Sequence, residues 1–174
     1  MFKPSYVVRG LPGHPIHPPL TDGAIGAYTA SVVLACLGAA GIAESALAKG
    51  WWLALLVGLG FAGLAALTGL IDWITITWGT PRWRTATFHM LVMLIATLLF
   101  VLAAIVGYDG YNTETVGRGA LALALAGWGF LTIGAWLGGT IVFTHGMRVL
   151  NVNEGPTAEE GTRERPEKEL AEGS

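Results

Sequence analysis

Four long apolar runs limit what this chain can fold into. They cover residues 20–43, 51–78, 86–107 and 119–144. Each is close to the ~20 residues that an α-helix needs to cross the ~30 Å hydrocarbon core of a bilayer. The runs are rich in Ala and Leu and lack the alternation of apolar and polar residues that membrane β-strands show. Only 13% of all residues are charged, against ~25% in soluble domains. We therefore expect an all-α, integral membrane four-helix bundle over residues 1–150.

The Lys and Arg residues indicate the orientation of this bundle. Two cationic residues, Lys49 and Arg118, fall on one side of a four-span topology. The other side carries five, even without the far C-terminal segment: Lys3, Arg9, Arg82, Arg84 and Arg148. Because cytoplasmic loops carry the excess of positive charge, we expect both termini to be cytoplasmic. The expected location is the inner (cytoplasmic) membrane, which the chain would cross several times within the lipid bilayer.

The C-terminal segment, residues 151–174, differs sharply from the rest of the chain. It has seven glutamates between Glu154 and Glu172 and almost no apolar residues. Such a composition cannot bury enough apolar surface to fold, so a disordered charged tail is expected. Its mildly acidic balance also argues against a nucleic-acid partner.

The few polar residues near the membrane gather at the predicted cytoplasmic end. His14 and His17 precede the first run, His89 begins the third, and His145 follows the fourth. Asp72 lies ~9 Å deeper in the second span than Trp78, as the rise of 1.5 Å per residue requires. A carboxylate at that depth needs a protein partner or a cavity. His14 by itself is expected to be solvated.

Small residues share helical phase with these polar groups. Close helix packing in a membrane is marked by such residues, and three runs carry stripes at spacings of three, four or seven: Gly58, Ala62, Ala65, Gly69 and Asp72; His89, Ala96 and Ala103; Gly127, Gly134, Gly138 and His145. The stripes predict that the polar groups face the interior. We therefore expect one clustered site formed by His17, Asp72, His89 and His145.

Four short motifs resemble a known family. They are "GHPIHPPLTD" before the first run, "LTGLIDW" (67–73), "FHM" (88–90) and "LGGTIVFTHGMRV" (137–149). Together they resemble a bacterial membrane family catalogued as domain of unknown function 2231, over residues 13–149. The resemblance implies a four-span membrane protein with histidines at these motifs, but no assigned reaction. Some family members are joined to Rieske-type iron–sulfur domains, which favours electron transfer with a redox partner such as an iron–sulfur protein. This chain has one cysteine and carries no such domain.

Haem b is the first chemistry that suits these residues. Imidazoles from facing helices can bind the haem iron from both sides, and His89 and His145 are the expected axial pair because both lie on inward helix faces. Gly134, Gly138 and Gly139 would offer a flat surface to the macrocycle. The chain has no C-x-x-C-H motif, which excludes covalent c-type haem.

Two other functions stay open. His17, His89 and His145, with Asp72, could hold a transition metal ion or handle protons, although the sequence shows no internal repeat of the kind that transporters often have. Alternatively, the polar cluster sets the helix register of a structural or interaction protein without a cofactor. Phosphate loops, nucleophile elbows and H-E-x-x-H are missing, so a redox or binding module is expected rather than a stand-alone enzyme. The sequence is compatible with an oligomer.

Overall fold

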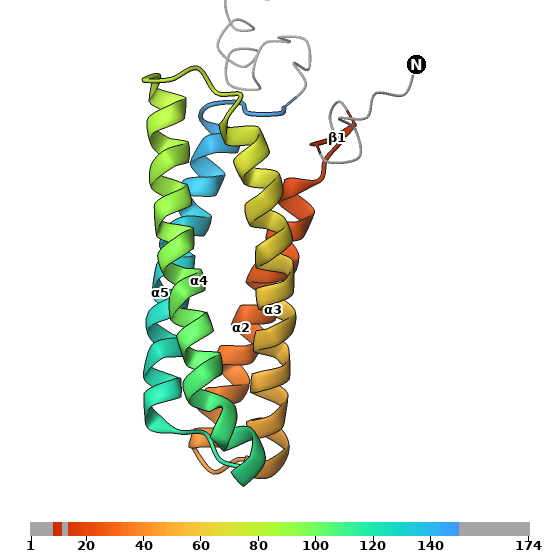
Figure 1. Cartoon of the computed structure of the whole chain (residues 1–174), viewed down its shortest axis with the longest axis vertical. Coiled ribbons are helices and arrows are strands. Elements are labelled where there is room, and N and C mark those ends of the chain that lie inside the picture. Colours follow the sequence, from red (N-terminus) through yellow and green to blue (C-terminus); the bar gives the residue numbers. More distant parts are fainter. Residues whose placement is uncertain (1–8, 12–13, 150–174) are drawn as a thin grey trace, which may run out of the picture.

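The computed structural model describes residues 9–11 and 14–149, and within them it forms an antiparallel bundle of four long helices (Figure 1). The helices are α2 (His17–Ala39), α3 (Glu44–Trp73), α4 (Pro81–Thr113) and α5 (Arg118–Phe143). All four are long and apolar enough to cross a membrane. The predicted four-helix membrane bundle is therefore confirmed. The predicted tail, residues 151–174, lies outside the described residues.

Local signals place several helix boundaries outside the apolar runs. α2 begins at His17, three residues before the predicted span, because Pro18 and Pro19 occupy its first turn, where a missing N–H costs nothing. The hydroxyl of Thr80 accepts a hydrogen bond from the backbone N–H of Trp83 and caps the start of α4. Helical structure thus extends beyond the apolar runs at these ends.

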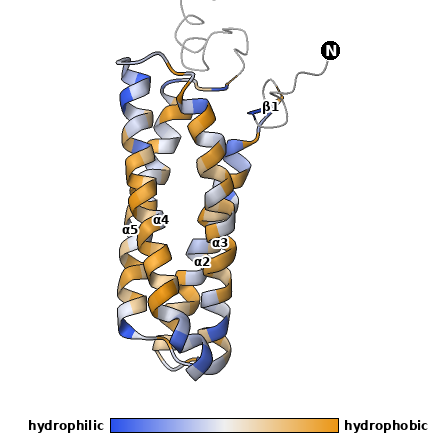
Figure 2. Cartoon of the chain, in the orientation of Figure 1, coloured by the Kyte–Doolittle hydropathy of each residue, from blue (hydrophilic) through white to orange (hydrophobic). Residues whose placement is uncertain are grey.

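Small side chains make up much of the interior of the bundle, around a few fully buried large ones such as Trp51, Tyr28 and Phe100. Ala35, Ala103, Ala120 and Ala124 are fully buried, whereas large apolar residues such as Phe143 are widely exposed on the outside. Figure 2 shows the apolar residues along the length of the helices and the hydrophilic ones mainly at the two ends. Lipid can solvate large apolar groups, so close packing of small residues is what brings the helices together.

The bundle consists of two helical hairpins with matching contacts. α2 packs chiefly on α3, and α4 packs chiefly on α5. A residue of α2 corresponds to the residue 72 positions later in α4, and a residue of α3 to the one 69 positions later in α5. The fully or almost fully buried counterparts are Ala24 and Ala96, Ser31 and Ala103, Leu55 and Ala124, and Trp51 and Ala120. The two hairpins therefore match each other in the positions of their buried residues, a relation that the search for an internal repeat in the sequence did not find.

A pair of aromatic rings joins the two hairpins along the middle of the bundle. The Tyr28 ring packs against Gly58, and the ring of its counterpart Phe100 packs against the counterpart glycine, Gly127. The two rings stack on each other with centroids 3.9 Å apart and planes 11° apart. The hairpins are thus related by an approximate two-fold axis along the bundle, and this stack lies at the axis.

Each end of the bundle carries a cluster of aromatic residues. The Trp83 ring on α4 contacts both Trp73 at the end of α3 and Trp78 in the connection between the two helices. Trp52 contacts Tyr108 and Tyr111 at the opposite end. Aromatic rings favour the membrane–water interface, so the two clusters mark the two surfaces of the bilayer.

Candidate functional site

His17 and His89 are held in the same way on the two hairpins. The Nδ1 atom of His17 lies 2.9 Å from the backbone oxygen of Ala65 on α3. The Nδ1 atom of His89 lies 2.8 Å from the backbone oxygen of Gly134 on α5. Because a carbonyl oxygen only accepts hydrogen bonds, each Nδ1 carries the proton and donates it. In the neutral imidazole each Nε2 therefore keeps its lone pair.

A glycine lies beneath each imidazole ring. A Cβ atom at Gly69 would stand 2.8 Å from Cε1 of His17, and one at Gly138 would stand 3.3 Å from Cε1 of His89. The glycine surface predicted for a macrocycle is thus used at Gly138 by an imidazole. Gly134 lies instead beside Met93, and Gly139 is near Phe143.

The two histidines are counterparts under the approximate two-fold relation. His17 and His89 are 72 residues apart, as are Tyr28 and Phe100. Their imidazoles are close enough to interact electrostatically, and both residues are half-buried. Among the described residues, neither Nε2 atom has a hydrogen-bond partner in the protein. The pair therefore presents two uncommitted imidazole nitrogens at one end of the bundle.

Asp72 is the buried acid of this end, with 8% of its side chain exposed. Its Oδ1 atom accepts hydrogen bonds from Nε of Arg9 at 3.2 Å and from Nη2 of Arg148 at 2.6 Å. Arg148 has a backbone φ of 63°, in the left-handed region that non-glycine residues seldom adopt. The prediction that Asp72 needs a protein partner is confirmed, but the sequence reasoning missed both arginines.

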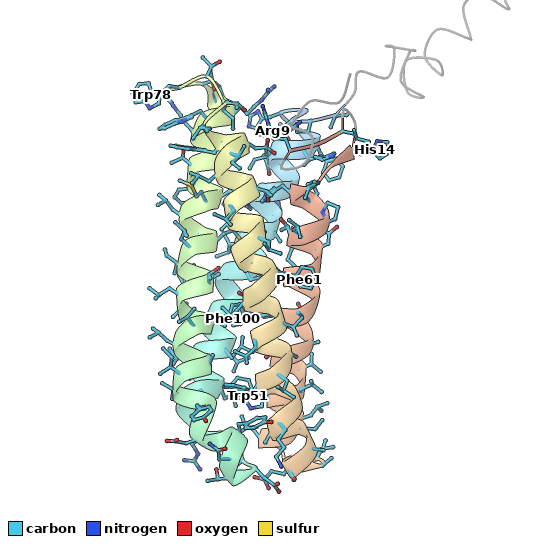
Figure 3. The ribbon with its side chains drawn as sticks, turned by 45° about the vertical axis from the view of Figure 1, so that its right-hand side comes forward. Arg9, His14, Trp51, Phe61, Trp78 and Phe100 are labelled. Carbon is cyan, nitrogen blue, oxygen red and sulfur yellow. The ribbon has the colours of Figure 1, made fainter. Side chains whose placement is uncertain are left out.

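His145 and His14 occupy different surroundings. Nε2 of His145 lies 3.1 Å from the hydroxyl of Thr85. Thr85 lies on α4, one helical turn before His89. The backbone oxygen of His145 accepts a hydrogen bond from Arg82. His14 lies in a two-residue strand, β2 (His14–Pro15), which pairs with β1 (Gly10–Leu11). It is exposed and points away from the bundle (Figure 3), as expected.

The described part of the chain brings the predicted site residues together only in part. His17 and His89 are within electrostatic range of each other, and Asp72 is within electrostatic range of His17. Within residues 9–11 and 14–149, no three His, Cys, Asp or Glu side chains converge as metal ligands would. The arrangement is therefore a pair of imidazoles beside a buried ion triad formed by Arg9, Asp72 and Arg148.

The fold and the site define a four-span helical membrane protein with a histidine pair at one end of the bundle. The chain belongs to the family described as "Predicted membrane protein (DUF2231)", whose profile matches residues 13–151. This match confirms the resemblance seen in the motifs. Searches of the curated proteins and of the solved structures found no match.

Proposed function

We propose that this protein binds haem b between its two hairpins, with His17 and His89 as axial ligands, and serves as an electron-transfer module of the membrane. The observation that carries the proposal is the pair of Nε2 lone pairs on counterpart histidines. Metal-binding histidines characteristically donate their other ring N–H to a carbonyl or carboxylate, which fixes the tautomer and the ring orientation. Both histidines already do so, through Ala65 and Gly134.

The number of available imidazoles favours haem over a bare metal ion. Two axial ligands complete the coordination of a haem iron, whose other four ligands come from the macrocycle. Zinc sites use three or four protein ligands, and the described residues offer no such group. A haem bound here would supply one-electron redox chemistry, and the chain would supply the two nitrogens and their orientation.

The choice of axial pair rests on what each histidine already contacts. His145 was expected to join His89, but its Nε2 atom lies beside the hydroxyl of Thr85. His17 has its Nε2 atom uncommitted and is the counterpart of His89. Packing between the hairpins is also less extensive than packing within them, so a flat group would enter at the boundary between the hairpins with less disruption than within either one. An iron–sulfur protein stays the expected type of redox partner.

An absorption spectrum of the full chain, purified from cells supplied with haem, tests this proposal. We expect a Soret band and a reduced α-band, and a pyridine haemochrome of the b type. His17→Ala and His89→Ala should each abolish these bands or shift them strongly. His14→Ala is the matched control, because His14 is exposed and outside the bundle, and it should leave the spectrum unchanged.

Three results would contradict the proposal. One is a colourless protein under haem-replete expression. Another is loss of the bands in His145→Ala together with an unchanged spectrum in His17→Ala, which would favour the pair His89 and His145. The third is a colourless protein with one bound metal ion that His17→Ala and His89→Ala remove, which would favour the metal hypothesis. Thermal unfolding of each variant shows whether a lost band reflects lost folding.

A further inference from the structure

An open cavity of about 560 Å³ lies at the end of the bundle near the histidine pair. It is bounded by the connection between α3 and α4, by the first turn of α4, and by the residues that follow α5. Neither His17 nor His89 lines it. Figure 3 shows Arg9 at this end and Trp78 in the same connection, turned outward. The cavity is therefore separate from the histidine pair.

The side chains that line this cavity are strongly cationic. Arg9, Arg82 and Arg148 contribute guanidiniums, and none of the lining residues within the described ranges is acidic. Asp72 forms ion pairs with both Arg9 and Arg148, so two positive charges share a single carboxylate. Arg82 donates to an uncharged backbone oxygen, that of His145. The three guanidiniums and the one carboxylate leave a net excess of two positive charges at the cavity, and Arg82 has no carboxylate partner among the described residues.

Hydrogen-bond donors are also left over at this cavity. Arg82 is exposed, and among the described residues its guanidinium makes a single hydrogen bond, to the backbone oxygen of His145. Arginine carries five N–H donors in a planar fork that suits phosphate oxygens. α4 begins at the rim of the cavity, directly after Thr80, so the positive end of its dipole adds to the field. Charge, spare donors and the helix end all favour an anion with several oxygens.

We infer that this cavity binds the phosphate group of an anionic ligand. Its volume of about 560 Å³ exceeds that of a free phosphate ion, so the cavity has room for a ligand that carries a further group. Two sources have this chemistry: the headgroup of an anionic phospholipid and a phosphorylated molecule in solution. Basic pockets between transmembrane helices bind anionic lipid headgroups in other membrane proteins. The inference does not depend on haem, because different residues form the two sites.

Binding to the purified full chain in an uncharged detergent tests the inference and separates the two sources. One titration uses short-chain phosphatidylglycerol, with phosphatidylcholine as the zwitterionic comparison. Another uses pyrophosphate, with potassium chloride at the same ionic strength as the comparison. Binding is followed by native mass spectrometry for the lipids and by thermal shift for pyrophosphate. Phosphatidylglycerol binding alone identifies a lipid headgroup, and pyrophosphate binding identifies a soluble ligand; either supports the inference.

Arg82→Gln is the decisive variant. It removes one guanidinium whose described contact is a single backbone oxygen, so the fold should survive. We expect binding to weaken about tenfold, the loss of one charged hydrogen bond. Arg84→Gln is the matched control, since Arg84 is exposed on the same turn but does not line the cavity. The inference is overturned if neither probe binds beyond its comparison, or if both variants weaken binding equally. His17→Ala should leave binding unchanged, which keeps this result separate from the haem test.

Discussion

Gly69 and Gly138 lie where any larger residue would meet an imidazole. We expect Gly69→Ala to cost about 1–3 kcal/mol, as overpacking usually does, and to displace His17. Gly138→Ala should cost less, because its Cβ would stand 3.3 Å from His89 rather than the 2.8 Å found at Gly69. Thermal unfolding measures both effects, and the haem spectrum reports any displacement of the rings.

Gly63→Ala and Gly129→Ala are the controls for these substitutions. Both glycines are helical, on α3 and α5, and a Cβ at either would meet nothing within 4 Å. They should melt like the natural protein or slightly above it, since alanine is the better helix former. If Gly69→Ala behaves like Gly63→Ala, the close packing of His17 on α3 is wrong.

The second residue-scale prediction concerns the ion triad. Asp72→Asn leaves Arg9 and Arg148 without their shared carboxylate. Removing one member of a fully buried ion pair costs about 3–5 kcal/mol. The side chains of Arg9 and Arg148, however, are 33% and 27% exposed to solvent. Solvent screening therefore reduces the expected loss to about 1–3 kcal/mol.

Asp22→Asn provides the comparison for Asp72→Asn, since it removes the same charge from an exposed position of α2. Its unfolding temperature should match that of the natural protein. Equal melting of the two variants would show that the triad contributes nothing to stability.

At the scale of elements, the stack of Tyr28 on Phe100 joins the two hairpins. The Tyr28 hydroxyl is buried without a hydrogen bond, although Thr97 is a polar neighbour. An unpaired buried hydroxyl costs about 1–3 kcal/mol, so Tyr28→Phe should preserve or raise the unfolding temperature. Tyr28→Ala should lower it strongly, because it removes the ring and leaves a cavity. A large loss in Tyr28→Phe would reveal a partner for the hydroxyl, such as a bound water.

A second contact between elements joins the start of α3 to the end of α4. Glu114 accepts hydrogen bonds from Lys49 and Ser45. The Lys49 hydrogen bond is the main cause that lowers the pKa of Glu114 below its ordinary value of 4.5, and Ser45 adds to it. A lowered pKa in the folded state gives a stabilisation that is present above the ordinary value and is lost as pH falls through the folded one.

Glu114→Gln should therefore melt slightly below the natural protein at neutral pH, and the difference should vanish in acid. Melting curves of both proteins, collected from neutral pH to below the lowered pKa of Glu114, measure this difference in unfolding temperature. Asp109→Asn, an exposed acid of the same helix end, should show no such pH-dependent difference. A difference that persists in acid would mean that the Glu114 charge is not its cause.

For the whole molecule, the even number of spans places the described chain ends at one end of the bundle (Figure 1). Positive charge predicts that this end is cytoplasmic. A reporter that is active only outside the cytoplasm should work when fused at residue 112 and fail when fused at residue 174. The reverse result would invert the orientation and place the arginine cavity at the outer surface.

Chain-local properties made the membrane architecture predictable. A span is recognised by the length of its apolar run, and interior faces by small residues at helical spacing, so four helices and most of the polar residues at one end followed from the sequence. The depth of Asp72 likewise indicated that it needed a partner. Boundaries were less accurate. The helix α3 begins at Glu44, seven residues before the predicted span, and ends at Trp73, five residues before the end of that span.

The repeat, by contrast, was visible only in three dimensions. Counterparts such as Trp51 and Ala120 share burial and position but not identity, so comparison of residue types does not reveal them. What the halves share is packing shape: a ring over a glycine, as in Tyr28 over Gly58 and Phe100 over Gly127. Different side chains can satisfy that shape, so only some counterparts, such as His17 and His89 or Gly58 and Gly127, keep the same residue type.

The pairing at the site also depended on tertiary contacts. The sequence analysis listed His17 and His89 as site residues but predicted His145 as the axial partner of His89. That prediction used only the helix face on which each histidine was expected to lie, which depends on neighbouring residues alone. The ring nitrogen that has no hydrogen bond is decided by carbonyl acceptors that are distant in the sequence. The backbone oxygen that accepts from His17 belongs to Ala65, 48 residues away, and the one that accepts from His89 belongs to Gly134, 45 residues away. Arg9 and Arg148 reach Asp72 across 63 and 76 residues. Hydrogen bonds over such separations exist only once the helices have packed, so only the folded bundle decides them.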